Sequence, residues 1–207
     1  TLDKALNSIK IQTYSSIEVI IVDGGSTDST LCIAEKYAKS MNIILLTNSN
    51  DLVDSLNQGF QAANGRLMTW LNSDDYYASC LSLERVVSIF QQRRCDYIIG
   101  DSLIRDHLTG KLRRIIPALL TGVLKGQGIN IFTGSLFFSK EIFKNFGGFN
   151  IKYKYSFEYE LIKFLIHNGN ICWSDHVLAV FLPREESISV KKQDQMLEER
   201  AQIYGNE

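Results

Sequence analysis

Two neighbouring carboxylates, Asp74 and Asp75, directly follow a strand pattern at residues 66–71, in the segment Asn72-Ser-Asp-Asp. Adjacent carboxylates repel each other, and a hard cation placed between them and a phosphate relieves that repulsion. Mg²⁺ or Mn²⁺, bound by one or two carboxylates and by diphosphate oxygens, suits this pattern. The alternative is a solvated turn that caps the next helix. That interpretation is simpler for an isolated pair, whereas the position at a strand end, combined with the motifs below, favours a cation site.

A third carboxylate, Asp23, ends the β-branched run at 18–22 and is followed by Gly24 and Gly25. Glycines allow a ligand to approach the backbone closely. We therefore expect Asp23 and Gly24 to contact the base or ribose of a nucleotide. The alternative is a plain strand–turn–helix junction, which explains the polar residues at 26–28 better than it explains Asp23.

The elements that must position these carboxylates alternate along the first hundred residues. Helix and strand patterns follow one another with short connections, which predicts an α/β fold with a doubly wound, mostly parallel sheet and helices on both faces. Ligands of such sheets bind at the carboxyl ends of the strands, where the three carboxylates fall. The expected helices are 2–11, a helix ending near 38, 52–63 and 81–92, and the expected strands are 18–22, 42–46, 66–71 and 97–99.

The second half of the sequence is less regular. A glycine-rich stretch at 122–128, which includes Lys125, could order over a diphosphate. We expect one domain over residues 1–207, with a nucleotide-sugar-binding half at 1–100 and an acceptor-binding half at 101–207. The expected elements of the second half are a hairpin at 101–114, strands at 135–138, 171–173 and 177–181, and helices at 140–145, 158–167 and 191–202.

Composition restricts the class of protein. The chain has 207 residues, of which 45% are hydrophobic and 22% charged, and a formal net charge of −1. These values are typical of a globular protein and do not favour nucleic acid as a partner. The four cysteines are scattered without metal-ligand spacing and read as reduced, mostly buried side chains. No apolar run reaches the roughly 20 residues that cross a bilayer. We expect a cytoplasmic protein, with peripheral membrane contact if its acceptor is lipid-linked.

Three segments in order resemble the family 2 glycosyltransferases of the GT-A fold. They read IQTYSSIEVIIVDGGSTDST, LNQGFQAANGRLMTWLNSDD and FGGFN followed by EYELIKFLIHNG, and the resemblance runs from Ile11 to about Gly169. The resemblance implies transfer of a sugar from a nucleoside-diphosphate sugar, most often UDP-linked, to an acceptor hydroxyl with inversion. It also implies surface polysaccharide or glycan assembly, with a glycan or a lipid-linked acceptor as partner.

The resemblance also assigns roles to individual residues. Asp23 matches the aspartate that contacts the nucleotide base. Asp74 and Asp75 match the acidic element that contacts the ribose and binds the divalent cation on the diphosphate, while Asn72 replaces that element's usual first aspartate. Glu158 stands at the position of the general base that takes the proton of the acceptor hydroxyl. Glu160 is a second candidate, which we expect to face solvent.

Two departures from the family pattern favour an alternative function. Nothing in the sequence matches the family's first strand, which would lie centrally in the sheet, and Phe157-Glu158 replaces the usual acidic pair. The alternative is a catalytically impaired nucleotide-sugar-binding or scaffolding module of the same fold. A nucleotidyltransferase is disfavoured, because the sequence shows no glycine-rich N-terminal phosphate loop with basic residues.

Other side chains receive simpler expectations. Tyr76 and Tyr77 directly follow the acidic pair and are expected to line the pocket. Trp70 and Trp173 lie in strand patterns and are expected in the core. The remaining expectations are surface charges at Arg113 and Arg114, and structural or exposed histidines at His107, His167 and His176.

Overall fold

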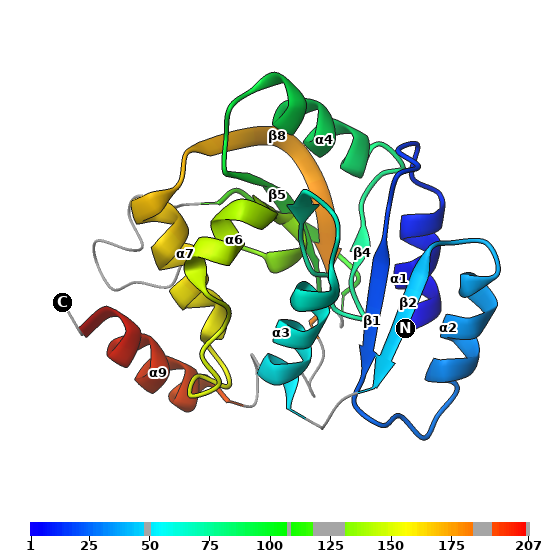
Figure 1. The fold of residues 1–207 in the computed structure, drawn as a ribbon, viewed down its shortest axis with the longest axis horizontal. Coiled ribbons are helices and arrows are strands. Elements are labelled where there is room, and N and C mark those ends of the chain that lie inside the picture. The colour runs from blue at the N-terminus through cyan, green and yellow to red at the C-terminus, as the bar shows by residue number, and fades with distance from the viewer. Residues whose placement is uncertain (48–50, 107–108, 118–130, 184–191, 206–207) are drawn as a thin grey trace.

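The computed structural model describes residues 1–47, 51–106, 109–117, 131–183 and 192–205 (Figure 1). Helices surround a curved central sheet, and a smaller pair of strands lies to one side of it. The elements are α1 (Leu2–Lys10), β1 (Val19–Asp23), α2 (Thr30–Ala38), β2 (Ile43–Thr47), α3 (Leu52–Ala62), β3 (Leu67–Met68), β4 (Tyr76–Tyr77), α4 (Ser82–Gln92), β5 (Tyr97–Arg105), β6 (Leu112–Ile115), η1 (Thr133–Ser135), β7 (Leu136–Ser139), α6 (Lys140–Phe146), α7 (Phe157–Asn168), β8 (Ile171–Phe181) and α9 (Gln193–Gly205).

The described strands form two sheets. Six strands make the larger sheet in the order β3-β7-β5-β8-β4, with β6 also paired to β5, while β1 and β2 form a separate two-stranded sheet. The pairs β1–β2 and β5–β8 are parallel, and the other four pairs are antiparallel. The expected α/β fold class is confirmed, and the two longest ladders, β1–β2 and β5–β8, are parallel; the described strands nevertheless form two sheets, and antiparallel pairs complete the larger one.

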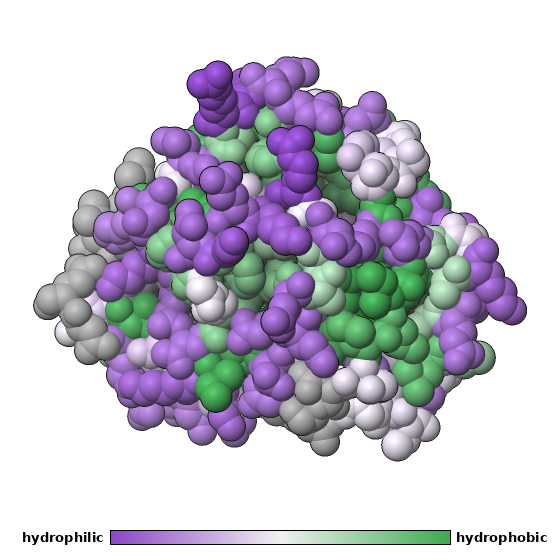
Figure 2. All heavy atoms as spheres, viewed as in Figure 1, coloured by the Kyte–Doolittle hydropathy of each residue, from purple (hydrophilic) through white to green (hydrophobic). Residues whose placement is uncertain are grey.

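The smaller sheet is incompletely covered. Helix α3 packs against β1 so closely that a Cβ atom on Gly59 would lie 3.2 Å from Cγ2 of Val22. Even so, the apolar strand residues 19–22 are only half-buried, and Leu45 of β2 is 39% exposed. Figure 2 shows hydrophobic surface where Figure 1 places β1 and β2.

Two hydrophobic clusters hold the larger sheet, one on each face. Because side chains alternate along a strand, Tyr97 and Ile99 of β5 enter one cluster and Ile98 enters the other. Helices α3, α6, α7 and α9 contribute to the first cluster, and α4 contributes to the second. Trp70 packs at the edge of the first cluster, 5.9 Å between ring centroids from Phe60, as expected for a core residue.

The helices lie close to their expected bounds, whereas several strands differ. Strand β3 is shorter than the expected 66–71, β4 was not expected, and the two strands expected at 171–173 and 177–181 form the continuous β8. A change of register at Asp101 lets β8 pair with β5 on both sides of its irregular middle. Trp173 of β8 is 44% exposed, so its expected place in the core is wrong. The glycine-rich stretch 122–128, with Lys125, lies outside the described residues.

Candidate functional site

The carboxyl ends of β1 and β2 point to the lower edge of the molecule in Figure 1. Helix α3 begins at the same edge, where the Asp51 carboxylate caps it by accepting hydrogen bonds from the N–H groups of Val53 and Asp54, both at 3.0 Å. The loop before α7 also reaches this edge. Strand ends and a helix start therefore converge here, which is the arrangement expected of a ligand site in an α/β fold.

Asp75 is the most buried carboxylate of the acidic turn, with 0% of its surface exposed. Its Oδ2 accepts a hydrogen bond from Nδ2 of Asn72 at 3.0 Å, and its Oδ1 accepts one from the backbone N–H of Leu182 at 3.1 Å. The backbone N–H of Asp75 also donates to the carbonyl of Asn72 at 3.0 Å. These bonds fix the acidic turn to the end of β8. Asn72 therefore orients an aspartate of the acidic pair.

Asp74 is half-buried, and so it retains an accessible surface that Asp75 lacks. Carboxylate oxygens are ligands that Mg²⁺ and Mn²⁺ prefer, so the chemistry of the turn fits a divalent cation. Within the described ranges, no group of three or more His, Cys, Asp or Glu side chains could hold a metal ion.

Asp23 is buried at the end of β1, with 5% of its surface exposed. Its Oδ2 accepts hydrogen bonds from the backbone N–H groups of Gly25 and Ser26, each at 2.9 Å. Hydrogen bonds from the Ser26 side chain and from these N–H groups lower the pKa of the Asp23 carboxyl. The carboxylate therefore shapes the turn that contains Gly24, and it is held ionised at the strand end.

Glu158 is the second residue of α7, and its side chain is half-buried. Burial raises the pKa of the Glu158 carboxyl to about 7, and Glu199 raises it too, whereas the backbone N–H of Glu158 and the cation of Arg200 lower it. Both charged neighbours belong to α9. A carboxyl with a pKa near 7 accepts a proton at neutral pH and is suited to general-base work.

Glu160 does not face solvent as expected. Its side chain is half-buried, and burial raises the pKa of the Glu160 carboxyl, while hydrogen bonds from Asn150 lower it. The expectation fails because the loop before α7 folds back against the first turn of that helix. Glu160 therefore faces this loop.

The tyrosines after the acidic turn lie in two environments. Tyr77 is 7% exposed and packs in the core against Phe137, so the expectation that it lines a pocket is wrong. Strand alternation turns it to the opposite side from Tyr76, which is half-buried beneath the Lys4 ammonium, 3.5 Å from the ring centroid.

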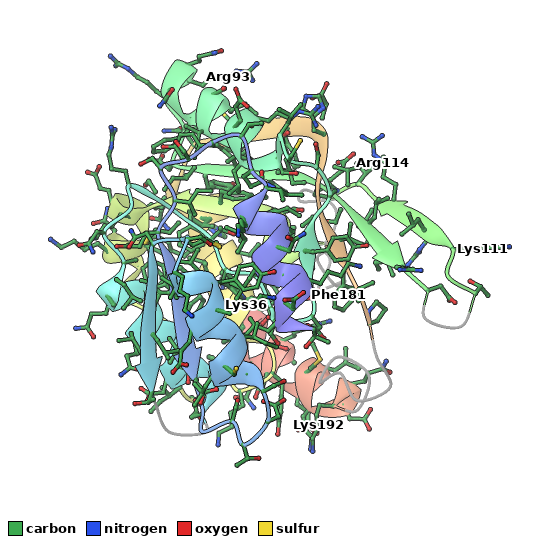
Figure 3. The ribbon with its side chains drawn as sticks, turned by 90° about the vertical axis from the view of Figure 1, so that its right-hand side faces the viewer. Lys36, Arg93, Lys111, Arg114, Phe181 and Lys192 are labelled. Carbon is green, nitrogen blue, oxygen red and sulfur yellow. The ribbon has the colours of Figure 1, made fainter. Side chains whose placement is uncertain are left out.

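An aromatic pair that sequence reasoning missed lies beside the acidic turn. The rings of Phe132 and Phe181 are 5.1 Å apart between centroids, and Phe181 directly precedes Leu182, whose N–H binds Asp75. Figure 3 shows Phe181 on β8. The two phenylalanines lie far apart in the sequence, so no local sequence pattern predicts their contact. The pairing of β8 with β4 brings Phe181 near the turn.

Arg114 is not an ordinary surface charge. It forms an ion pair with the buried carboxylate of Asp101 and donates from Nη2 to the carbonyl of Asp175 at 3.0 Å. Figure 3 shows Arg114 near the base of the β5–β6 hairpin and Lys111 toward its tip. Arg113 is exposed, and so are His167 and His176, as expected. His107 lies outside the described residues.

The matching family model is described as "Glycosyl transferase family 2", and it covers residues 1–154. It spans β1, the acidic turn and the larger part of the central sheet. The chain belongs to glycosyl transferase family 2. Membership confirms the resemblance carried by the sequence motifs.

Curated relatives of this family 2 chain come from bacteria. A "PGL/p-HBAD biosynthesis glycosyltransferase" of Mycobacterium bovis is 30% identical over 157 residues, which are 74% of this chain and 59% of the relative. The "Putative glycosyltransferase EpsE" of Bacillus subtilis is 28% identical over 154 residues, which are 72% of this chain and 55% of the relative. The chain thus spans less than two thirds of these relatives.

Solved structures of low sequence identity share the fold of the family 2 chain. TarS 1-349 of S. aureus in complex with UDP gives a TM-score of 0.74 at 19% identity, over 98% of this chain and 65% of TarS 1-349. The complex of TarS 1-349 with UDP-GlcNAc gives a TM-score of 0.74 at 20% identity, over 90% of this chain and 56% of the TarS chain. The mannosyltransferase PcManGT of Pyrobaculum calidifontis, with GDP-Man and Mn²⁺, gives 0.67 at 19% identity, over 90% and 54%. These likenesses confirm the GT-A fold.

None of the helices in the described part of the family 2 chain has the length and apolar character needed to cross a membrane.

Proposed function

We propose that the chain transfers a sugar from a UDP-sugar to an acceptor hydroxyl with inversion, using Mg²⁺ or Mn²⁺. The observation that carries the proposal is the acidic turn, with Asp75 anchored to the end of β8 and Asp74 beside it half-buried. Asp23 lies at the end of β1. Relatives whose structures contain UDP, UDP-GlcNAc, or GDP-Man with Mn²⁺ support a nucleotide-sugar donor and a divalent cation.

In the proposed reaction, Asp23 and Gly24 contact the base and Asp74 faces the ribose and the diphosphate. Asp74 and Asp75 are the proposed ligands of the cation. Asp74 is half-buried and keeps an accessible surface, whereas Asp75 is fully buried, accepts hydrogen bonds at both oxygens and chiefly fixes the position of the turn. The cation, when bound, neutralises charge that develops on the diphosphate leaving group.

Glu158 is the proposed general base. Its carboxylate accepts the proton of the acceptor hydroxyl as that oxygen attacks the anomeric carbon and the bond to the diphosphate breaks. The raised pKa of about 7 supports this role, because a base whose pKa lies near the working pH accepts a proton readily and is about half ionised there. We propose a glycan or a lipid-linked glycan as the acceptor, in surface polysaccharide assembly at the cytoplasmic face of a membrane. Family membership alone supports that setting.

The test begins with calorimetric titration of UDP into the chain with and without Mn²⁺. We expect Mn²⁺-dependent binding that Asp74→Ala reduces at least about tenfold, since a direct ligand or charge partner is removed. Asp175→Ala, which changes an aspartate of β8 whose side chain is 93% exposed, is the matched control. Binding that is equally strong without Mn²⁺, or unchanged in Asp74→Ala, would contradict the metal–diphosphate assignment. A parallel titration with GDP tests whether the site prefers uracil to guanine as the nucleotide base.

Transfer is tested next, by release of UDP from UDP-sugars in the presence of a mixture of candidate glycan acceptors. Glu158→Gln should lower kcat by roughly 10²- to 10⁴-fold, while UDP binding is unchanged, because the variant loses proton acceptance alone. Equal turnover of the wild type and the variant would exclude Glu158 as the base.

The divided sheet favours a second candidate, a nucleotide-sugar-binding module without transfer. Asp23, the proposed base contact, ends a strand of the smaller sheet, which no described strand joins to the larger one. This candidate predicts UDP binding with no sugar transfer by the wild-type chain. Measured transfer that depends on Glu158 would exclude it.

A further inference from the structure

The loop before α7 is held by one carboxylate of the last helix. Glu199 of α9 accepts hydrogen bonds from the backbone N–H groups of Lys154, Tyr155 and Ser156, at 2.9, 2.9 and 2.8 Å. These residues directly precede α7, whose second residue is Glu158. Three N–H groups on one ionised carboxylate make a strong local anchor, because hydrogen bonds to a charged acceptor are stronger than neutral ones.

Further contacts press α9 against α7. The hydroxyl of Ser156 donates to the carbonyl of Met196 at 3.1 Å, so the residue at the N-cap position of α7 bonds to α9 and leaves its own helix uncapped. Nζ of Lys163 donates to the carbonyl of Ile203 at 2.9 Å, and the Arg200 guanidinium lies 4.1 Å from the ring centroid of Tyr159. The start of α7 is therefore positioned from outside, by α9.

We propose that Glu199 is a positioning residue for Glu158, fixing the first turn of α7 so that the Glu158 carboxylate points at the acceptor hydroxyl. The inference rests on the proposed role of Glu158 as general base. The backbone at residues 154–157 determines the position of the first turn of α7, and therefore of the Glu158 side chain. A displacement of about 1 Å in a catalytic group lowers a rate by roughly 10²-fold.

The same helix sets the charge around Glu158. The groups of α9 that act on the Glu158 carboxyl are the Glu199 carboxylate, the Arg200 guanidinium and the Tyr204 hydroxyl. Glu199 raises the pKa of Glu158 and Arg200 lowers it. Removing the negative charge of Glu199 therefore lowers this pKa, whereas removing the positive charge of Arg200 raises it.

The test compares Glu199→Gln with Glu198→Gln in the full chain. Glutamine keeps the size of the side chain but offers a single carbonyl oxygen to three N–H groups, and Glu198 is an exposed neighbour on the same helix. With UDP-GlcNAc as donor probe, Glu199→Gln should lower kcat roughly 10- to 100-fold and leave KM for the donor within about twofold. The acid limb of its kcat profile should move to lower pH. Glu198→Gln should change none of these.

Two measurements keep this inference separate from the proposed function. A pH titration by ¹³C NMR of the Glu158 carboxyl reports its pKa without turnover, and amide hydrogen exchange of residues 154–158 reports the order of the loop. Positioning predicts a lower pKa and faster exchange in Glu199→Gln, and the opposite pKa shift in Arg200→Met. If Glu158→Gln abolishes transfer but Glu199→Gln matches the wild type, the positioning role is wrong. If Glu158→Gln leaves transfer intact, the proposed base is wrong, whatever Glu199 does.

A purely structural Glu199 gives a different pattern. It would lower donor binding and the urea midpoint together, with no movement of the pH profile, and that result would overturn the inference. If the Glu199→Gln variant does not fold, Glu199→Asp replaces it in the same measurements. The shorter carboxylate retains the charge but loses reach, so it should lower kcat without moving the acid limb of the profile.

Discussion

Asp74 and Asp75 are consecutive in the sequence but differ in burial. The sequence placed the pair at a strand end, and it gave no means of telling which carboxylate would face solvent. That distinction depends on Leu182, which lies 107 positions beyond Asp75 and supplies a backbone N–H to it. A contact between such distant residues leaves no local pattern in the sequence.

The difference in burial predicts different effects on stability. Asp75→Ala removes a fully buried side chain that accepts hydrogen bonds from the N–H of Leu182 and the amide of Asn72; each lost bond costs about 0.5–1.5 kcal/mol, and the space left behind adds to the loss. We expect the free energy of unfolding, measured with urea, to fall by about 2–4 kcal/mol. Asp74→Ala should lower it by less than about 1 kcal/mol. Equal losses would show that Asp75 is not the anchor of the turn.

Glu158 predicts a dependence of stability on pH. Its pKa is raised from an ordinary value of 4.5 to about 7 in the folded chain, so its protonated form stabilises the fold. That contribution is complete below pH 4.5 and is lost as the pH rises through 7. Wild type should therefore lose on the order of 1–3 kcal/mol relative to Glu158→Gln between pH 4.5 and pH 8. Urea unfolding at both pH values checks this, and a constant difference between the two proteins would contradict it.

At the scale of elements, helices followed their sequence patterns more closely than strands did. A helix bonds within itself, so periodic apolar positions and caps such as Asp51 are enough to locate it. A strand needs a partner. Strand β4 consists of Tyr76 and Tyr77, pairs with β8, and has no pattern of its own. The β5–β6 hairpin was predicted because its turn is local, but the ion pair across it was not.

That ion pair predicts unequal roles for two adjacent arginines. Arg114→Ala would leave the buried Asp101 carboxylate without its half-exposed cation, and we expect a loss of about 1–3 kcal/mol in the free energy of unfolding. Arg113→Ala, at an exposed position one residue away, should change it by less than about 0.5 kcal/mol. Thermal and urea unfolding of both variants measure the difference. Similar losses in the two would mean that the Asp101 pair contributes little.

At the scale of the whole molecule, the divided sheet is the main departure from the expected fold. The sequence predicted strands 18–22 and 42–46 well, because each is a β-branched or apolar run, and the parallel β1–β2 pair agrees with the mostly parallel sheet expected. It could not indicate that these strands would stay apart from the larger sheet. Their side chains are half-buried, whereas β5 and β7 are buried along most of their lengths.

Unequal burial predicts unequal protection of the two sheets. Amides of β1 and β2 should exchange with solvent deuterium at least about tenfold faster than amides of Tyr97–Ile99 and of β7, because a two-stranded sheet opens locally at lower free energy. Hydrogen-exchange mass spectrometry or NMR on the ligand-free chain tests this. Matching protection in both sheets would mean that they open as one cooperative unit.

The anchoring of Asp75 by Leu182 also fixes an order of events during synthesis. A ribosome that has just released the acidic turn still has to add 107 residues before the N–H partner of Asp75 exists. At about 5–20 residues per second, that wait is on the order of 5–20 s. Strand β4 waits equally for β8, and the middle of the larger sheet is completed only when β8 joins β5. The nascent chain therefore exposes its acidic turn without the Leu182 contact until β8 has been translated.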